Sequence, residues 1–274
     1  MSTSTHSEAE ILPAGSQPAQ PGARASGEST YVPARSRRSS FFAAPGTYLL
    51  VGINCAVFVW MVLHGVSPKE PTLAQLVHYG ATSTDNILAG QWWRLLTATF
   101  VHVGLIHIAT NMWCLWNLGL LGEPLLGPVG LVAIYLITGI AGNLLSLVVN
   151  VILRDNSVGA GASGAVFGIA GILIVLLSNH KLPIPWSELK RLRRSVVQFA
   201  GLNLVIGLAT VILPVIRIDN MAHLGGFLSG LALGVPLVPR MTAGRTRYLS
   251  RQKIVFAVAT FLLALFGYWI AKLR

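Results

Sequence analysis

Residues Gly159 to Gly168 read Gly-Ala-Gly-Ala-Ser-Gly-Ala-Val-Phe-Gly, a run of small residues around one serine, Ser163, at the start of an apolar stretch. Small residues let two helices approach closely, so the run taken alone favours a packing role for Ser163. The run also suits a nucleophile. A glycine turn can expose the hydroxyl at a helix start, where backbone N–H groups point toward a developing oxyanion.

The composition of the chain is that of a helical membrane protein. Of its 274 residues, 53% are hydrophobic and 11% are charged, and the mean hydropathy is +0.65. Soluble domains carry about 25% charged residues, so we expect an all-α polytopic membrane protein. The apolar runs predict seven transmembrane segments, at 46–64, 104–122, 129–150, 163–178, 197–213, 222–238 and 254–271. Two cysteines, Cys55 and Cys114, lie within apolar runs and are interpreted as packing residues.

The chain divides into three predicted regions. Residues 1–42 are rich in Ser, Ala, Pro and Gly, which predicts a disordered cytoplasmic tail. Residues 43–240 predict a membrane core of six transmembrane helices, and 241–274 predict a basic loop and a seventh helix. The connection 65–103 contains Gln-Trp-Trp-Arg at 91–94, whose tryptophans indicate a segment at the membrane interface.

Lysine and arginine set the predicted orientation. They concentrate in the tail and in the loops 179–196 and 239–253, and seven spans place all three on one side. The positive-inside rule makes that side cytoplasmic and the C-terminus external. The net charge of +11 follows from this asymmetry, with some attraction to anionic lipid, so we expect no nucleic-acid partner. The N-terminus shows no organelle presequence, which favours a bacterial plasma membrane.

Three of the expected helices carry polar residues in one leaflet. Ser163 and His223 lie at the outer ends of the fourth and sixth spans, and His107 and Asn111 lie in the outer half of the second. Polar side chains in lipid are costly and usually face the bundle interior or a water-filled cavity. A site shared by these helices is therefore the preferred interpretation.

His223 begins a helix with a smooth face. Gly226 and Gly230 recur every four residues after it, so another backbone can come close. If that neighbour is the small-residue face of the fourth span, His223 can serve as base for Ser163; otherwise it is a structural residue. Phe167, one turn after Ser163, is placed to pack against His223.

His107 and Asn111 are spaced i, i+4 and share a helix face. They form either an interhelical hydrogen-bonding pair or a side-chain oxyanion hole. His102, at the outer edge, supports the loop or the site. Asp219 precedes His223 by four residues, as a third member of a triad or as a solvated loop acid, and the second interpretation is preferred.

Two other site chemistries lack their signatures. A zinc site needs ligands that the sequence does not offer, because no His-Glu-x-x-His occurs and the one intramembrane acid candidate, Glu123, lies at the inner end of the second span. We therefore expect no metal and no cofactor. A transporter would show a broken helix or ion-binding acids at mid-membrane, and neither is evident.

The combination resembles the rhomboid family of intramembrane serine proteases over about residues 46–238. The segment 161–164 resembles the family's Gly-x-Ser-Gly motif, and 222–230 resembles its Ala-His-x-x-Gly-x-x-x-Gly motif. Further matches are His102, His107 and Asn111 for His-x-x-x-x-His-x-x-x-Asn, Trp93-Arg94 for the Trp-Arg of the first external loop, and Leu118-Gly119, Glu123 and Gly127 for Leu-Gly-x-x-x-Glu-x-x-x-Gly.

The resemblance implies a six-helix catalytic bundle plus one C-terminal transmembrane helix, with an active site that opens to the outer face. Ser163 would be the nucleophile of a Ser–His dyad and His223 its general base. The oxyanion would be held by His107, Asn111 and the Ser163 N–H. The expected supporting residues are His102, Gly161, Gly164, Phe167, Gly226, Gly230, Trp93 and Arg94.

The family's substrates are single-span or other transmembrane proteins. They are cleaved near helix-weakening residues after entry between spans two and five, and the loop before His223 is expected to act as a moving cap. An inactive relative that binds transmembrane helices as a chaperone is the alternative function.

Overall fold

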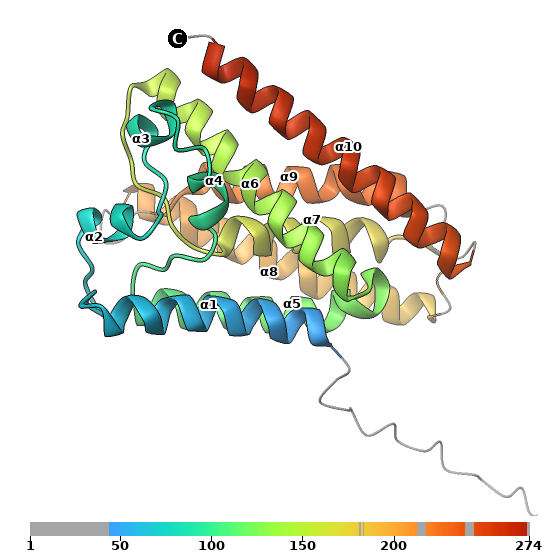
Figure 1. Cartoon of the computed structure of the whole chain (residues 1–274). Helices are drawn as coiled ribbons and strands as arrows, with labels where there is room; N and C mark the ends of the chain where they lie inside the picture. Colours follow the sequence, from blue (N-terminus) through green and yellow to red (C-terminus); the bar gives the residue numbers. More distant parts are fainter. Residues whose placement is uncertain (1–43, 181, 183, 213–217, 239–243, 273–274) are drawn as a thin grey trace, which may run out of the picture. The chain divides into compact units, whose positions relative to one another are not determined.

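The structure, a computed structural model, describes residues 44–180, 182, 184–212, 218–238 and 244–272. Within these ranges it contains ten helices and no strand (Figure 1). Their bounds are α1 Pro45–Leu63, α2 Leu73–His78, α3 Thr84–Leu88, α4 Arg94–Thr97, α5 Leu105–Leu126, α6 Pro128–Leu153, α7 Ser163–Leu176, α8 Trp186–Ile212, α9 Asn220–Leu237 and α10 Arg245–Lys272.

The seven longer helices coincide with the seven predicted spans, and the chain is an all-helical polytopic membrane protein. By length and composition alone, α1, α6 and α10 are long and apolar enough to cross a membrane, and α7 is a shorter apolar helix. The predicted tail, 1–42, lies outside the described residues. The division between 43–240 and 241–274 stays a prediction.

Two helices begin well before their predicted spans. The fifth span was expected from 197 and α8 begins at Trp186; the seventh was expected from 254 and α10 begins at Arg245. The added residues are rich in Lys and Arg, which are good helix formers although they are not apolar. Hydropathy therefore marks only the apolar part of each helix. The long connection 65–103 folds into three short helices, α2, α3 and α4.

Helix α7 lies at the centre of the bundle. Eleven of its 14 residues are buried, and α5, α6, α8 and α9 all pack against it. At about 1.5 Å per residue, this helix is only about 21 Å long, shorter than the ~30 Å hydrocarbon core of a bilayer. A loop, 154–162, therefore leads from the end of α6 back into the bundle before α7 starts at Ser163.

Buried polar contacts join the helices at the end of the bundle away from Ser163. The Glu123 carboxylate, 3% exposed near the end of α5, accepts hydrogen bonds from the backbone N–H groups of Gly46 and Thr47 at 2.8 and 2.7 Å and from the Thr47 hydroxyl at 2.7 Å. It thereby satisfies the free N–H groups at the start of α1 and matches the positive end of the helix dipole. Glu123 is buried at the end of the second span, where the sequence placed it.

Helix α10 runs obliquely beside α6 and also contacts α9 (Figure 1). Gln252 donates to the Leu126 carbonyl at the end of α5, at 2.9 Å. Further along α10, Gly267 lies against the Trp92 ring and Ile270 joins an apolar cluster with Leu95 and Leu144. Much of the remaining α10 surface consists of exposed apolar side chains, as expected of a helix at the lipid boundary.

Candidate active site

Ser163 is the first residue of α7, and the turn before it depends on a glycine. Gly161 has φ +134°, a conformation that L side chains rarely adopt. A Cβ atom there would also lie 2.7 Å from Cε1 and 3.0 Å from Nε2 of His107. The His107 ring therefore fills the space next to the Gly161 backbone, two residues before the candidate nucleophile.

His102 anchors the same turn from the other side. Its ring is fully buried, with Nδ1 3.1 Å from the Phe100 carbonyl oxygen and Nε2 accepting from the Ala162 N–H at 3.4 Å. Both contacts fit one neutral tautomer with the proton on Nδ1. Burial, and then the nearby His107, lower the pKa of His102 to about 3, against an opposing effect of the Phe100 carbonyl. Of its two expected roles, His102 supports the loop that leads to Ser163.

The geometry also indicates which nitrogen of His107 carries its proton. The Val103 N–H donates to Nδ1 of His107 at 3.4 Å, which leaves the proton on Nε2. The Asn111 amide, one turn along α5, donates one hydrogen to the His107 carbonyl at 2.9 Å, and its second hydrogen is a further donor. Each side chain therefore keeps one hydrogen that can be donated.

The helices that carry Ser163 and His223 touch backbone to backbone. A Cβ on Gly164 would lie 3.1 Å from the Ala222 carbonyl oxygen. A Cβ on Gly226 or Gly230 would overlap the carbonyl oxygen of Gly164 or Gly168, respectively. The predicted glycine contact between the fourth and sixth spans is present. Since Gly164 follows Ser163 and Ala222 precedes His223, the contact brings the two candidate residues into the same neighbourhood.

The His223 ring stacks on Phe167, as the sequence suggested, with centroids 4.5 Å apart and planes 17° apart. The side chain is 7% exposed, and its buried Nδ1 has no hydrogen-bond partner. No carboxylate among the described residues orients this ring.

Asp219 does something that the sequence interpretation missed. It lies just before α9, is half-buried, and its carboxylate bonds to groups other than the His223 ring. Its Oδ1 accepts from the Ala222 N–H at 2.9 Å and so caps α9, and its Oδ2 accepts from the Ser146 hydroxyl of α6 at 2.6 Å. Aspartate just before an apolar helical run is an N-cap signal that was available in the sequence.

Trp93 and Arg94 hold the connection before α5 in place. The Arg94 side chain, 6% exposed, donates to the Ala81 carbonyl at 2.9 Å and to the Gln91 side chain at 2.7 Å. Burial lowers the pKa of Arg94. Trp93 is half exposed, and its ring lies 4.6 Å from the Arg94 guanidinium carbon. Neither residue belongs to the cluster around Ser163.

Comparison with known proteins identifies the fold family. Residues 89–240, more than half of the chain, match the Rhomboid domain. The chain belongs to the rhomboid family. This family consists of intramembrane serine proteases together with inactive members. All the predicted site residues of this rhomboid protein fall within the matched range, whereas α1 and α10 lie outside it.

Several curated relatives are named as rhomboid proteins. The chain is 34% identical to Rhomboid protease GluP of Bacillus subtilis over 79% of its own length and 39% of the relative. It is 32% identical to RHOMBOID-like protein 6, mitochondrial, of Arabidopsis thaliana, over 72% of this chain and 64% of the relative. It is 29% identical to Rhomboid protease AarA of Providencia stuartii, over 73% of this chain and 75% of the relative. This rhomboid protein thus spans about two fifths to two thirds of the first two relatives.

Two hollows flank the candidate site of this rhomboid protein. An apolar cavity of about 220 Å³ lies between α7, α8 and α9, with His223 and Phe167 in its wall. Its other lining residues are Ile174, Val197, Ala200, Gly201, Leu204, Leu224 and Phe227.

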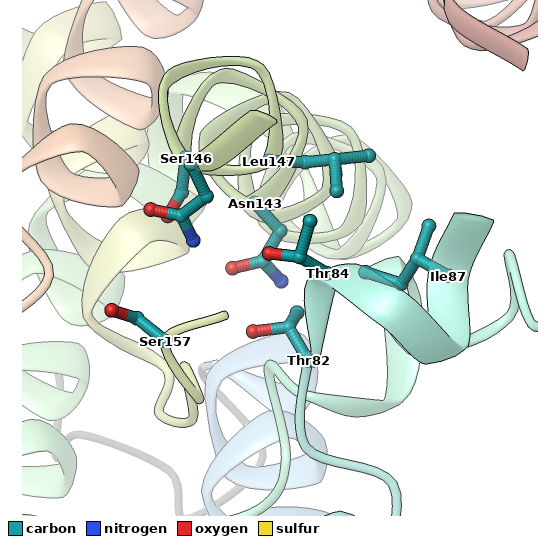
Figure 2. Close-up of a pocket in the computed structure, with 8 residues that line it drawn as sticks. Thr82, Thr84, Ile87, Asn143, Ser146, Leu147 and Ser157 are labelled. Carbon is teal, nitrogen blue, oxygen red and sulfur yellow. The ribbon is translucent and has the colours of Figure 1, made fainter. Parts of the chain in front are cut away.

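The second hollow is polar. Figure 2 shows Thr82 and Thr84 from the connection before α5 facing Asn143 and Ser146 of α6, with Ser157 alongside. Thr82 also exchanges hydrogen bonds with the Gly159 backbone, at 2.8 to 3.0 Å. Because Ser146 binds Asp219, this cluster ties the start of α9 to the loop that leads to Ser163.

Proposed function

We propose that this chain is an intramembrane serine endopeptidase that uses a Ser163–His223 dyad. The observation that supports the proposal is the glycine contact between α7 and α9, which brings Gly164, the residue after Ser163, against Ala222, the residue before the buried His223. A serine needs a base to be nucleophilic at neutral pH, and we assign that role to His223, whose Nδ1 has no hydrogen-bond partner.

The reaction follows from these positions. Ser163 Oγ attacks a peptide carbonyl while His223 takes its proton. His107 Nε2–H, the free hydrogen of the Asn111 amide and the Ser163 N–H stabilise the oxyanion. His223 then gives the proton to the leaving amine, an acyl-enzyme forms, and water hydrolyses it with His223 as base again.

The substrates are transmembrane proteins, single-span or other. A fully hydrogen-bonded helix hides its carbonyls from attack, so cleavage should occur near residues that weaken a substrate helix. The apolar cavity beside His223 suits an apolar side chain next to the scissile bond. Substrate entry between α5 and α8, and a loop before α9 that moves as a cap, are parts of the same proposal.

The orientation is likewise proposed. Lysine and arginine concentrate in the first turns of α8 and α10. By the positive-inside rule, these ends face the cytoplasm, together with the N-terminus. The C-terminus then lies outside, and the site opens outward in a bacterial plasma membrane.

A fluorophosphonate probe tests the dyad. Purified protein should be labelled, and the label should be lost in Ser163→Ala and in His223→Ala but kept in Ser195→Ala, an exposed serine of α8. Folded protein that takes no label and cleaves no transmembrane reporter would instead be an inactive helix-binding relative.

Acidification gives a second test. Activity should fall as His223 takes up a proton and can no longer accept one from Ser163. A rate that does not fall at any pH at which the protein stays folded would contradict the role of His223.

A further inference from the structure

An arginine with two buried, unpartnered nitrogen atoms lies near the start of α10. The Nε and Nη1 atoms of Arg251 are inaccessible to solvent and have no hydrogen-bond partner. One turn earlier on the same face, the Tyr248 hydroxyl is also buried, in a residue that is 6% exposed. Its oxygen lies near the Gln252 side chain, and its hydrogen has no acceptor. Two donors that share one helix face are therefore unused.

No acidic side chain among the described residues neutralises Arg251. Within the described ranges the one ion pair is Arg191–Glu188 on α8. Glu123, at the same end of the bundle, is fully engaged by the start of α1. Gln252, the neighbour of Arg251, donates to the Leu126 carbonyl. Leaving the buried Nε and Nη1 hydrogens of Arg251 without acceptors is costly, so the site calls for an anion with several acceptor oxygens.

The surroundings fit a phosphate group at a membrane surface. Arg245, Arg247 and Lys253 are exposed on the same stretch of helix and add positive charge. A guanidinium and a phenol hydroxyl are both donors, and the guanidinium fork matches the geometry of phosphate oxygens. The positive surroundings disfavour a headgroup that carries its own cation.

An apolar ridge continues from Arg251 along α10. Ile254, Val258 and Phe261, at three, seven and ten residues beyond Arg251, are 65%, 51% and 65% exposed. At 3.6 residues per turn they lie on the side of the helix that Arg251 occupies. A ligand with a phosphate at Arg251 and acyl chains along this ridge would accept the unused hydrogen bonds and also cover the exposed apolar side chains.

We infer that Arg251 and Tyr248 bind the phosphate of an anionic phospholipid in the leaflet that faces this end of the bundle, with its acyl chain along Ile254, Val258 and Phe261. The bound lipid holds α10 beside the junction of α5 and α6, where Gln252 is attached. The site is independent of the proposed protease chemistry.

Native mass spectrometry of the full chain tests this site. Protein is released from nanodiscs of phosphatidylcholine with and without phosphatidylglycerol. Wild type should retain phosphatidylglycerol, and Arg251→Gln should lower its occupancy about tenfold, as loss of charge-assisted hydrogen bonds predicts. Arg247→Gln, which removes the same charge one turn away, should change it less than about twofold. Tyr248→Phe removes only the hydroxyl and should give an intermediate loss, which separates ligand binding from misfolding.

Three outcomes would overturn the inference. Equal losses in Arg251→Gln and Arg247→Gln would indicate a diffuse surface attraction. Equal retention of phosphatidylcholine would show that negative charge is not recognised. Inorganic phosphate that raises the melting temperature in detergent as much as phosphatidylglycerol does, and loses this effect in Arg251→Gln, would assign the site to a soluble anion.

Discussion

The two sides of α7 are built in opposite ways. On the α9 side the helices touch backbone to backbone, and glycines leave no room for even one methyl group. On the α8 side large apolar side chains and a cavity of about 220 Å³ separate the helices, and Phe199 of α8 lies 6.3 Å from Phe167, centroid to centroid. The α9 side is therefore suited to fix the positions of two reacting groups, and the α8 side is suited to receive a ligand.

The largest effect is expected where the tight side is broken. Leucine at Gly226 would overlap the Gly164 carbonyl, so α7 and α9 must separate. Overpacking of this kind costs about 1–3 kcal/mol or more, and a shift of about 1 Å at the site can lower the rate about 100-fold. Thermal unfolding and cleavage of a transmembrane reporter measure the two effects.

Gly201 of α8 provides the matched control, because a Cβ there meets no atom within 4 Å. Gly201→Ala should raise stability by about 0.5–1 kcal/mol and leave cleavage nearly unchanged. A Gly226→Leu protein with wild-type activity would show that the close contact does not position the dyad.

A smaller effect is expected at the start of α9. Asp219→Ala removes both the cap and the bond to Ser146, at a cost of about 0.5–2 kcal/mol. We expect kcat to fall about tenfold with little change in KM, because His223 shifts while the substrate surface is kept. Asp219→Asn, which still accepts at Oδ1, should recover most of the rate. Equal losses in both variants would indicate that the charge, and not the cap, is required.

The loose side can be tested by filling it. Gly201→Leu should occupy the cavity and slow cleavage of a transmembrane substrate about tenfold, while labelling of Ser163 by a small fluorophosphonate stays within about twofold. Both rates are measured on the same preparation. If cleavage and labelling fall together, the cavity does not receive substrate. The α8 side of α7 would then have no role in binding a ligand.

The last effect concerns the loop between α6 and α7 and appears only on acidification. Because the pKa of His102 is lowered to about 3 in the fold, the unfolded chain binds a proton there at a higher pH than the folded chain does. The stability that comes from keeping His102 neutral in the fold is fully present above about pH 6.5. It is lost as the pH falls toward about 3. The melting temperature should therefore fall on acidification, less steeply in His102→Gln. Parallel curves for the two proteins would exclude His102 as the cause.

The sequence predicted the seven helices and the close contact between α7 and α9, because both depend on strong local signals. Apolar runs mark the spans, and glycines spaced by four mark the face of α9 that meets α7. The sequence did not predict those parts of the helices that are not apolar. The early start of α8 is hidden because Lys190 to Arg194 continue a helix that hydropathy cannot see.

Contacts between distant segments were also out of reach. Asp219 and Ser146 are 73 residues apart, and neither carries a pattern that names the other. The apolar cavity depends on how α8 packs, which the sequence of α8 alone does not determine. The catalytic roles of Ser163, His223, His107 and Asn111 remain predictions.

The Glu123 contact also has a consequence for the order of synthesis. The acceptor of the Gly46 N–H is the Glu123 carboxylate, which emerges from the ribosome 77 residues later. At roughly 5–20 residues per second, that interval is about 4–15 s. During it the start of α1 must remain hydrated or held by the insertion machinery. The start of α1 is therefore fastened only after α5 has been delivered.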